Sequence, residues 1–326
     1  MTLSNWRAET FPRASALSPP ASTSQNVVTI AVVDDAVDTR HPEFAGRIAG
    51  QWDAGSGAHS SIPSGWQPHG TKVAGLALAG GTKVTGIAPD ARLLGVRVPA
   101  LSSKLGDPTE AAAIRWAAEN GADVICCAWG PQQLTEESGK IPDHTRHAID
   151  WAVTHGRGGK GCVVLFSSGN DGADIALNEY ASHPSVIAVG ACNSRAKRPD
   201  YSGWGNALWC VAPSNDPRDP ACADETYDTT TPVGSFLLGE TFYTADFGFT
   251  SAACAIAAGV CARILSVNPQ LTWREVRDVI AKSCRKIDCD SAVYDGRGHS
   301  EYYGYGCLDL PRAIQIALQK NSTAAV

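Results

Sequence analysis

Five short runs of aliphatic and β-branched residues recur along this chain, and helical patterns separate them. The runs are VVTIAVV, ARLLGVRV, ADVICCAW, CVVLF and SVIAVGA. None alternates apolar with polar residues, which is typical of strands that are buried on both faces. Strands that alternate with helices form a mainly parallel sheet. We therefore predict a three-layer α/β fold with a doubly wound central sheet flanked by helices.

Helices are predicted where apolar residues recur with helical spacing between turn residues. They occupy residues 69–80, 108–121, 144–156, 251–265, 272–284 and 310–318. The segment 204–249 breaks the alternation of strands and helices, and we expect loops with an antiparallel hairpin there. No internal repeat and no linker is recognisable. We predict one domain over residues 27–318, with a flexible N-terminal extension over 1–26 and a C-terminal tail over 319–326.

The overall charge excludes some classes of partner. The 326 residues carry 27 Lys and Arg against 33 Asp and Glu, a formal net charge of -6. This balance provides no field that would attract nucleic acid. We find neither a signal-like apolar run at the N-terminus nor a later segment that approaches the ~20 apolar residues needed to cross a bilayer. We expect a cytoplasmic protein with no membrane partner, or a secreted one if a precursor segment is missing from this sequence.

Eleven cysteines are present, an odd number, and they lack the C-x-x-C spacing of zinc sites. Several lie in apolar runs, where a free thiol behaves as a small hydrophobic group. A bridge between Cys284 and Cys289 or between Cys210 and Cys222 stays open for a secreted protein.

A glycine-rich segment, GRGGKG at residues 156–161, satisfies the pattern G-x-G-x-x-G. It follows a predicted helix and precedes a predicted strand, whereas a dinucleotide-binding motif follows a strand and opens a helix. We interpret it as a helix-to-strand turn. A nucleotide-binding α/β domain is the alternative that this segment alone supports.

Three polar residues stand at the ends of apolar elements. Asp34 ends the first strand, His69 opens the first helix, and Ser251 opens an Ala-rich helix that could pack through the centre of the domain. Each alone is explained as a cap or as a residue of a helix terminus. Together, a hydroxyl, an imidazole and a carboxylate are what acyl transfer through a serine requires.

Four ordered motifs resemble those of the subtilisin-like serine peptidases (S8 type), most closely the kexin and furin branch. The motifs are IAVVDDAVDTRHPEF, HGTKVAG, FSSGNDG and FTSAACAIAAG, and the resemblance covers about residues 27–318. It implies that Ser251 is the nucleophile, His69 the general base and Asp34 the residue that orients the imidazole. It also implies that Asn170 donates to the oxyanion.

The resemblance implies a serine endopeptidase that acts through an acyl-enzyme, with a processing role on a precursor peptide. Its partner would be a peptide or protein substrate in extended conformation, paired along strand edges. The substrate-binding residues that it implies are Asp35, Ala128, Trp129, Gly130, Ser167, Ser168 and Gly169.

The chain departs from the family pattern at several positions. Gln132 and Gln133 stand where the branch has acidic residues that select arginine, so dibasic specificity is not carried over. Phe249 replaces the family's glycine before Thr-Ser, Lys72 replaces its second histidine, and Ala255 replaces its proline.

Two alternative functions use the same residues. A peptide ligase or macrocyclase would intercept the acyl-enzyme with an amine, and a catalytically weak pseudoprotease would only bind peptides. No cofactor is predicted. Calcium is common in the family, but its ligands are not identifiable, and Asp53, Asp107 and Asp171 are interpreted as solvated loop carboxylates.

Overall fold

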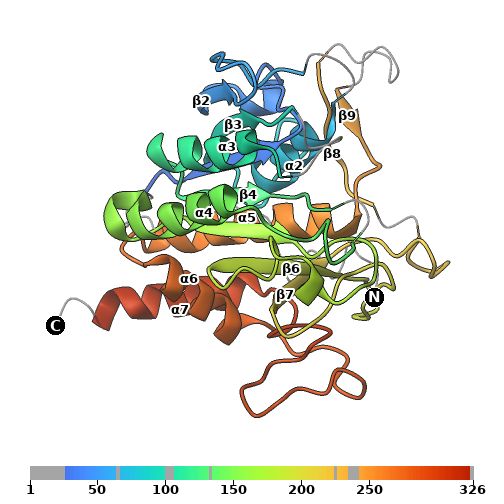
Figure 1. The fold of residues 1–326 in the computed structure, drawn as a ribbon. Coiled ribbons are helices and arrows are strands. Elements are labelled where there is room, and N and C mark those ends of the chain that lie inside the picture. The colour runs from blue at the N-terminus through green and yellow to red at the C-terminus, as the bar shows by residue number, and fades with distance from the viewer. Residues whose placement is uncertain are drawn as a thin grey trace.

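The computed structural model describes residues 26–63, 67–99, 106–131, 134–223, 226–233 and 242–323. Its centre is a seven-stranded sheet with the order β2-β3-β1-β4-β5-β6-β7 (Figure 1). All six neighbouring pairs are parallel, which confirms the predicted doubly wound sheet. The strands are β1 Thr29–Asp34, β2 Ile48–Asp53, β3 Arg92–Arg97, β4 Val124–Cys127, β5 Val163–Ser167, β6 Val186–Cys192 and β7 Leu208–Pro213.

The two outermost strands, β2 and β7, were not predicted. β2 has the sequence IAGQWD and is only half-buried, so it lacks the continuous apolar run of a central strand. β7 is mostly buried but lies inside the segment 204–249 that was expected to form loops. The hairpin expected in that segment is confirmed by the antiparallel pair β8 (Thr229–Thr230) and β9 (Tyr243–Thr244).

Helices cover both faces of the sheet (Figure 1). On one face, α3 (Pro108–Glu119) and α4 (Asp143–His155) pack against each other, and α2 (His69–Leu78) and α5 (Phe249–Val267) pack together on the other. The last two helices, α6 (Trp273–Ser283) and α7 (Leu310–Thr323), lie beside α5. α7 continues to Thr323, so part of the predicted C-terminal tail is helical. The predicted extension 1–26 lies outside the described residues except for its last residue, Asn26.

α5 is the central helix of the molecule. Its mean hydropathy of 1.7 over an 18-residue window would suit a membrane span, yet 94% of that window is buried inside the protein. Small residues allow this close packing: a Cβ at Gly259 would lie 2.5 Å from Cβ of Ile87. α5 is therefore a core helix that contacts β1, β4, β5, β6 and β7.

The strand order reverses at β1. From β1 the chain adds β2 and β3 on one side, and from β4 onward it adds strands on the other side. In open α/β sheets, ligands bind at the carboxyl ends of the strands where the order reverses. This rule predicts a ligand site at the carboxyl ends of β1 and β4.

The cysteines form no disulfide bond. All eleven cysteines are free and only Cys289 is exposed, so neither bridge left open by the sequence is formed.

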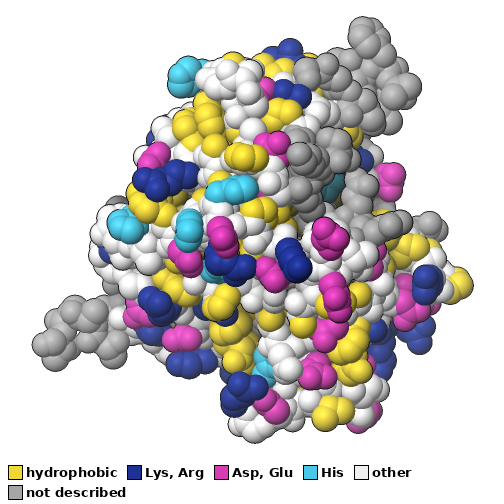
Figure 2. Space-filling view, viewed as in Figure 1, with side chains coloured by type: hydrophobic (Ala, Val, Ile, Leu, Met, Phe, Trp, Pro, Cys, Tyr) yellow, Lys and Arg dark blue, Asp and Glu magenta, His cyan; other side chains and the backbone are white. Residues whose placement is uncertain are grey.

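GRGGKG lies between α4 and β5, and its first part forms the short helix η3 (Gly156–Gly159), which confirms the predicted turn. On the face shown in Figure 2, side chains of both charge signs are interspersed.

Candidate active site

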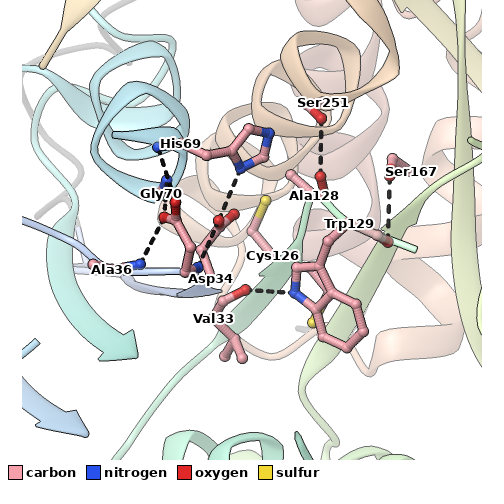
Figure 3. Close-up of polar contacts among 12 residues, drawn as sticks. Val33, Asp34, Ala36, His69, Gly70, Cys126, Ala128, Trp129, Ser167 and Ser251 are labelled. Carbon is pink, nitrogen blue, oxygen red and sulfur yellow. Dashed lines mark hydrogen bonds and ion pairs between the residues drawn. The ribbon is translucent and has the colours of Figure 1, made fainter. Parts of the chain in front are cut away.

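Asp34 and His69 form a hydrogen-bonded pair at the carboxyl end of β1 (Figure 3). Oδ1 of Asp34 accepts from Nδ1 of His69 at 2.8 Å and from the backbone N–H of Asp35 at 2.8 Å. Asp34 is 1% exposed, and its Oδ2 has no hydrogen-bond partner among the described residues. Such a buried carboxylate favours a positive charge on the imidazole that it contacts.

Asp35 fixes the start of α2. The helix has Pro68 as its N-cap and no side-chain cap there, and the Asp35 carboxylate supplies the missing acceptors. Its Oδ1 accepts from Gly70 N–H at 2.9 Å, and its Oδ2 accepts from His69 N–H at 3.4 Å. A carboxylate at a helix N-terminus is stabilised by the unpaired N–H groups and the helix dipole. Asp35 thus positions His69, and its expected contact with substrate stays a prediction.

Gly70 allows β1 and α2 to approach closely. A Cβ at this position would lie 2.3 Å from the carbonyl oxygen of Ala36 and 2.6 Å from Cβ of Asp34. No side chain fits in that space. The glycine after His69 is therefore required by the distance between the two elements.

The charges of the site shift two pKa values. Burial is the largest single influence on His69 and lowers its pKa, but attraction and hydrogen bonding to Asp34 outweigh it and raise the pKa to about 9. Burial and repulsion from Asp34 raise the pKa of Asp35 to about 6. The site thus stabilises a protonated imidazole next to Asp34.

Ser251 lies in the first turn of α5 and is 9% exposed. Its Oγ donates to the carbonyl oxygen of Ala128 at 2.9 Å rather than to His69 (Figure 3). Serine side chains occupy three staggered rotamers. The hydroxyl must therefore give up its bond to Ala128 before it can donate to the imidazole.

Asn170 follows β5 and faces the start of α5. Its Oδ1 accepts from the backbone N–H of Thr250 at 3.1 Å and from the Thr250 hydroxyl at 2.7 Å. Two donors on one oxygen identify that atom as the carbonyl of the amide. The Nδ2 group is therefore directed away from Thr250 and remains a donor. The sequence analysis missed Thr250, whose position before the serine indicated only a helix cap.

The residues expected to frame a substrate follow two adjacent strands. Ala128, Trp129 and Gly130 come directly after β4, and Ser167 ends β5 with Ser168 and Gly169 after it. Nε1 of Trp129 donates to the carbonyl oxygen of Val33 at 2.7 Å, which fixes the ring beneath the site. Gln132 and Gln133 lie outside the described residues.

Two neighbours complete the surroundings of the imidazole. The ring of Phe247, which the sequence analysis did not single out, meets His69 edge-on with centroids 5.8 Å apart. Nζ of Lys72 donates to the carbonyl oxygen of Asp246 at 3.2 Å. Phe247 and Asp246 both belong to the segment that precedes α5, and the His69 side chain remains 36% exposed beside it.

Phe249 has an unusual backbone conformation two residues before Ser251. Its φ is +59°, and the residue is 41% exposed. The left-handed region costs a non-glycine residue roughly 1–2 kcal/mol. The conformation is held from both sides, because Phe249 N–H donates to Oδ1 of Asn215 at 2.9 Å and its carbonyl accepts from the Ser214 hydroxyl at 2.9 Å.

The carboxylates considered for a metal are used otherwise. Asp53 is buried and pairs with Arg97 at 2.6 Å, so its expected solvation is wrong. Asp107 caps α3 by accepting from Thr109 N–H at 2.9 Å, whereas Asp171 is exposed. Within the described ranges, no group of three or more His, Cys, Asp or Glu residues could hold a metal ion.

A parallel α/β sheet with an Asp–His pair and a serine at its carboxyl ends defines a serine hydrolase site. The chain belongs to the subtilase family of serine proteases, the peptidase S8 family, which it matches over residues 25–306. It is 42% identical over 308 residues to the "calcium-dependent protease" of Trichormus variabilis, with 89% of this chain and 46% of that protein covered. The kexin of Candida albicans is 30% identical, with 90% and 31% covered. The chain thus spans less than half the length of these relatives.

Solved structures with the same fold include proteases of different kinds. The "Prenylagaramide maturation protease PagA" has a TM-score of 0.67 at 28% identity, with 88% of this chain and 93% of that chain covered. Fervidolysin from Fervidobacterium pennivorans has a TM-score of 0.71 at 23% identity, with 97% and 44% covered. The predicted subtilisin-like fold and family are confirmed.

Proposed function

We propose that this protein is a serine endopeptidase that cleaves peptide bonds through an acyl-enzyme intermediate. The observation that carries the proposal is the hydrogen bond between Asp34 and His69, in a chain whose family consists of serine proteases. Asp34 orients the ring so that Nδ1 donates to the carboxylate, which leaves Nε2 as the proton acceptor.

The mechanism begins with a rotation of Ser251 from Ala128 toward His69. Oγ then attacks the peptide carbonyl carbon while its proton passes to Nε2, and Asp34 stabilises the imidazolium. The oxyanion accepts from Nδ2 of Asn170 and from the backbone N–H of Ser251. His69 next gives the proton to the departing amine. Water, deprotonated by His69, finally hydrolyses the ester and restores the serine.

We further propose that the substrate is an extended precursor peptide whose acyl half lies along residues 128–130 and 167–169. The support is the 28% identity, over 88% of this chain, to PagA, which is named a maturation protease. Dibasic selectivity, which belongs to the name of the 29% identical "dibasic-processing endoprotease" of Schizosaccharomyces pombe, is not part of the proposal. A buried guanidinium needs a counter-ion, and Gln132 and Gln133 carry no charge. Sequencing the products of a mixed peptide library identifies the residue preferred before the cleaved bond.

The calcium requirement in the Trichormus relative's name is not carried over to this chain. Asp53 is engaged by Arg97, and the buried carboxylate of Glu43 accepts from the N–H groups of Thr82, Lys83 and Val84. These carboxylates do not fit a cation site, since their oxygens already accept from donors. The mechanism above uses no metal. No contact in the described residues favours an amine over water as acceptor, or binding without turnover.

A fluorophosphonate probe tests the proposal. We expect the wild-type protein to be labelled and to cleave peptides, and Ser251→Ala to do neither. Ser266→Ala is the matched control, because Ser266 lies on the same helix with its hydroxyl bonded to the Arg263 carbonyl. An unlabelled wild type, or equal labelling of Ser251→Ala, would show that this serine is not the nucleophile.

A further inference from the structure

Phe249 combines a strained backbone with an exposed aromatic ring beside the nucleophile. Among the described residues, five that are not glycine have positive φ, and Phe249 is the aromatic one. A residue in a sparsely populated conformation persists only where its surroundings hold it there, and such residues cluster at functional sites. Burial does not explain the ring, since 41% of the residue remains exposed. The position therefore points to a role outside the protein core.

The ring is held rigidly relative to the reacting groups. The hydrogen bonds to Ser214 and Asn215 fix the backbone of Phe249 on one side, and the bonds of Thr250 to Asn170 fix it on the other. The ring lies against Tyr201, with centroids 4.8 Å apart and the planes tilted by 54°.

Tyr201 belongs to the same fixed assembly. Its hydroxyl donates to the carbonyl oxygen of Asn215 at 2.7 Å, and its carbonyl accepts from Gly172 N–H at 2.7 Å. The first bond ties the ring to the segment that holds Phe249. The second ties it to the loop that carries Asn170.

The sheet order places this pair on one side of the site. Residues 128–130 follow β4 and Asn170 follows β5, whereas Tyr201 follows β6 and Asn215 follows β7. In the order β4-β5-β6-β7, the two rings and residues 128–130 thus lie on opposite sides of Asn170. A peptide whose acyl half pairs with residues 128–130 extends its amine half toward the rings.

We propose that Phe249 and Tyr201 form an aromatic platform for the leaving half of the substrate. The platform contacts the residue immediately after the scissile bond and favours a large apolar side chain there, because apolar contact with exposed ring surface removes both from water. The proposal rests on the peptidase function proposed above and adds a selectivity determinant to it.

The experiment compares two peptides that differ only after the scissile bond, one with leucine and one with glycine. The ratio of their kcat/KM values measures the selectivity for the residue after the scissile bond. In the wild type we expect a ratio of at least about tenfold in favour of leucine, the scale of a few apolar groups in a binding site. Phe249→Gly should bring the ratio close to one, and Phe249→Tyr, which keeps a ring, should retain it. A peptide methyl ester, which has no residue after the reacting carbonyl, measures the acyl-transfer chemistry separately.

Val293→Gly is the matched control. Val293 also has a positive φ, +48°, and it is 79% exposed in the loop between α6 and α7. Its replacement relieves the same kind of backbone strain, and we expect the leucine-to-glycine ratio to stay as in the wild type. A wild-type ratio near one, or an unchanged ratio in Phe249→Gly, overturns the platform while ester hydrolysis leaves the peptidase function standing. A wild type that hydrolyses neither peptides nor ester overturns both.

Discussion

Asp34 uses one carboxylate oxygen for two hydrogen bonds, and this arrangement sets the chemistry of the site. The sequence indicated Asp34, His69 and Ser251 because each is a reactive type at the end of an apolar element. It could not indicate that Ser251 bonds to Ala128, because a rotamer depends on the neighbours that the fold brings together. The same limit applies to Thr250, whose bonds to Asn170 join two segments distant in the chain.

The pairing of His69 with Asp34 predicts how activity depends on pH. The general base must be neutral, so activity is lost as pH falls through the pKa of His69. Because Asp34 raises this pKa above its usual 6.5, we expect the acidic limb of the kcat/KM profile above pH 6.5. Asp34→Asn removes the attraction, so the limb should move to lower pH while kcat falls about 10⁴-fold.

Asp278→Asn is the control for this profile, because Asp278 is exposed on α6. The acidic limb of the kcat/KM profile of Asp278→Asn should coincide with that of the wild type. An Asp34→Asn limb at the same or a higher pH would contradict the assignment of the limb to His69.

Asn170 should act in the transition state rather than in substrate binding. Asn170→Ala is expected to lower kcat by about 10²- to 10³-fold with little change in KM, the usual effect of removing one oxyanion donor. Asn170→Asp is a second variant, since it keeps an acceptor for Thr250 but has no N–H group. Steady-state kinetics measures kcat and KM, and thermal melting shows whether a variant has also lost stability. A normal kcat in Asn170→Asp would be incompatible with donation by Nδ2.

At the scale of elements, continuous apolar runs predicted the five central strands, and apolar residues with helical spacing predicted the six long helices of the described residues. The edge strand β7 is apolar and mostly buried, and it was missed because it lies in the segment 204–249 that was expected to form loops. The edge strand β2 was missed for a physical reason. An edge strand has a neighbour on one side only, so β2 needs no continuous apolar run. The hairpin of β8 and β9 was expected in the segment 204–249, but its two strands, of two residues each, are too short to be located from a pattern.

The contact between α2 and β8 depends on a glycine. A Cβ at Gly75 would lie 2.3 Å from Oγ1 of Thr230 and 2.4 Å from Oγ1 of Thr229. Gly75→Ala would force these elements apart, and we expect the free energy of unfolding to fall by about 1–3 kcal/mol. Urea denaturation measures the change. Gly296→Ala, where an added Cβ meets no atom within 4 Å, should unfold like the wild type. Equal free energies of unfolding for both variants would show that α2 and β8 can move apart without loss of stability.

At the scale of the whole molecule, the thiols report on the integrity of the core. Ten of the eleven cysteines are buried, and Cys289 is exposed. Burial also raises the pKa of Cys254 and Cys210 far above the usual range, which keeps them as unreactive thiols.

A thiol reagent should therefore modify about one cysteine per native molecule and all eleven after unfolding. Mass spectrometry of the labelled peptides identifies the site. Cys289→Ser should abolish labelling of the native protein. Rapid modification of several cysteines under native conditions would mean that the core opens readily.

The reacting groups come from opposite ends of the chain. Asp34 and His69 belong to β1 and α2, and the serine arrives only with α5, after the strands β3 to β7. A copy of the chain that ends before α5 lacks the hydroxyl of Ser251, and it also lacks the helix that packs against β1 and β4 to β7. Under the proposed function, a chain that ends before α5 is therefore expected to be inactive, and the complete site forms only once α5 has packed against the sheet.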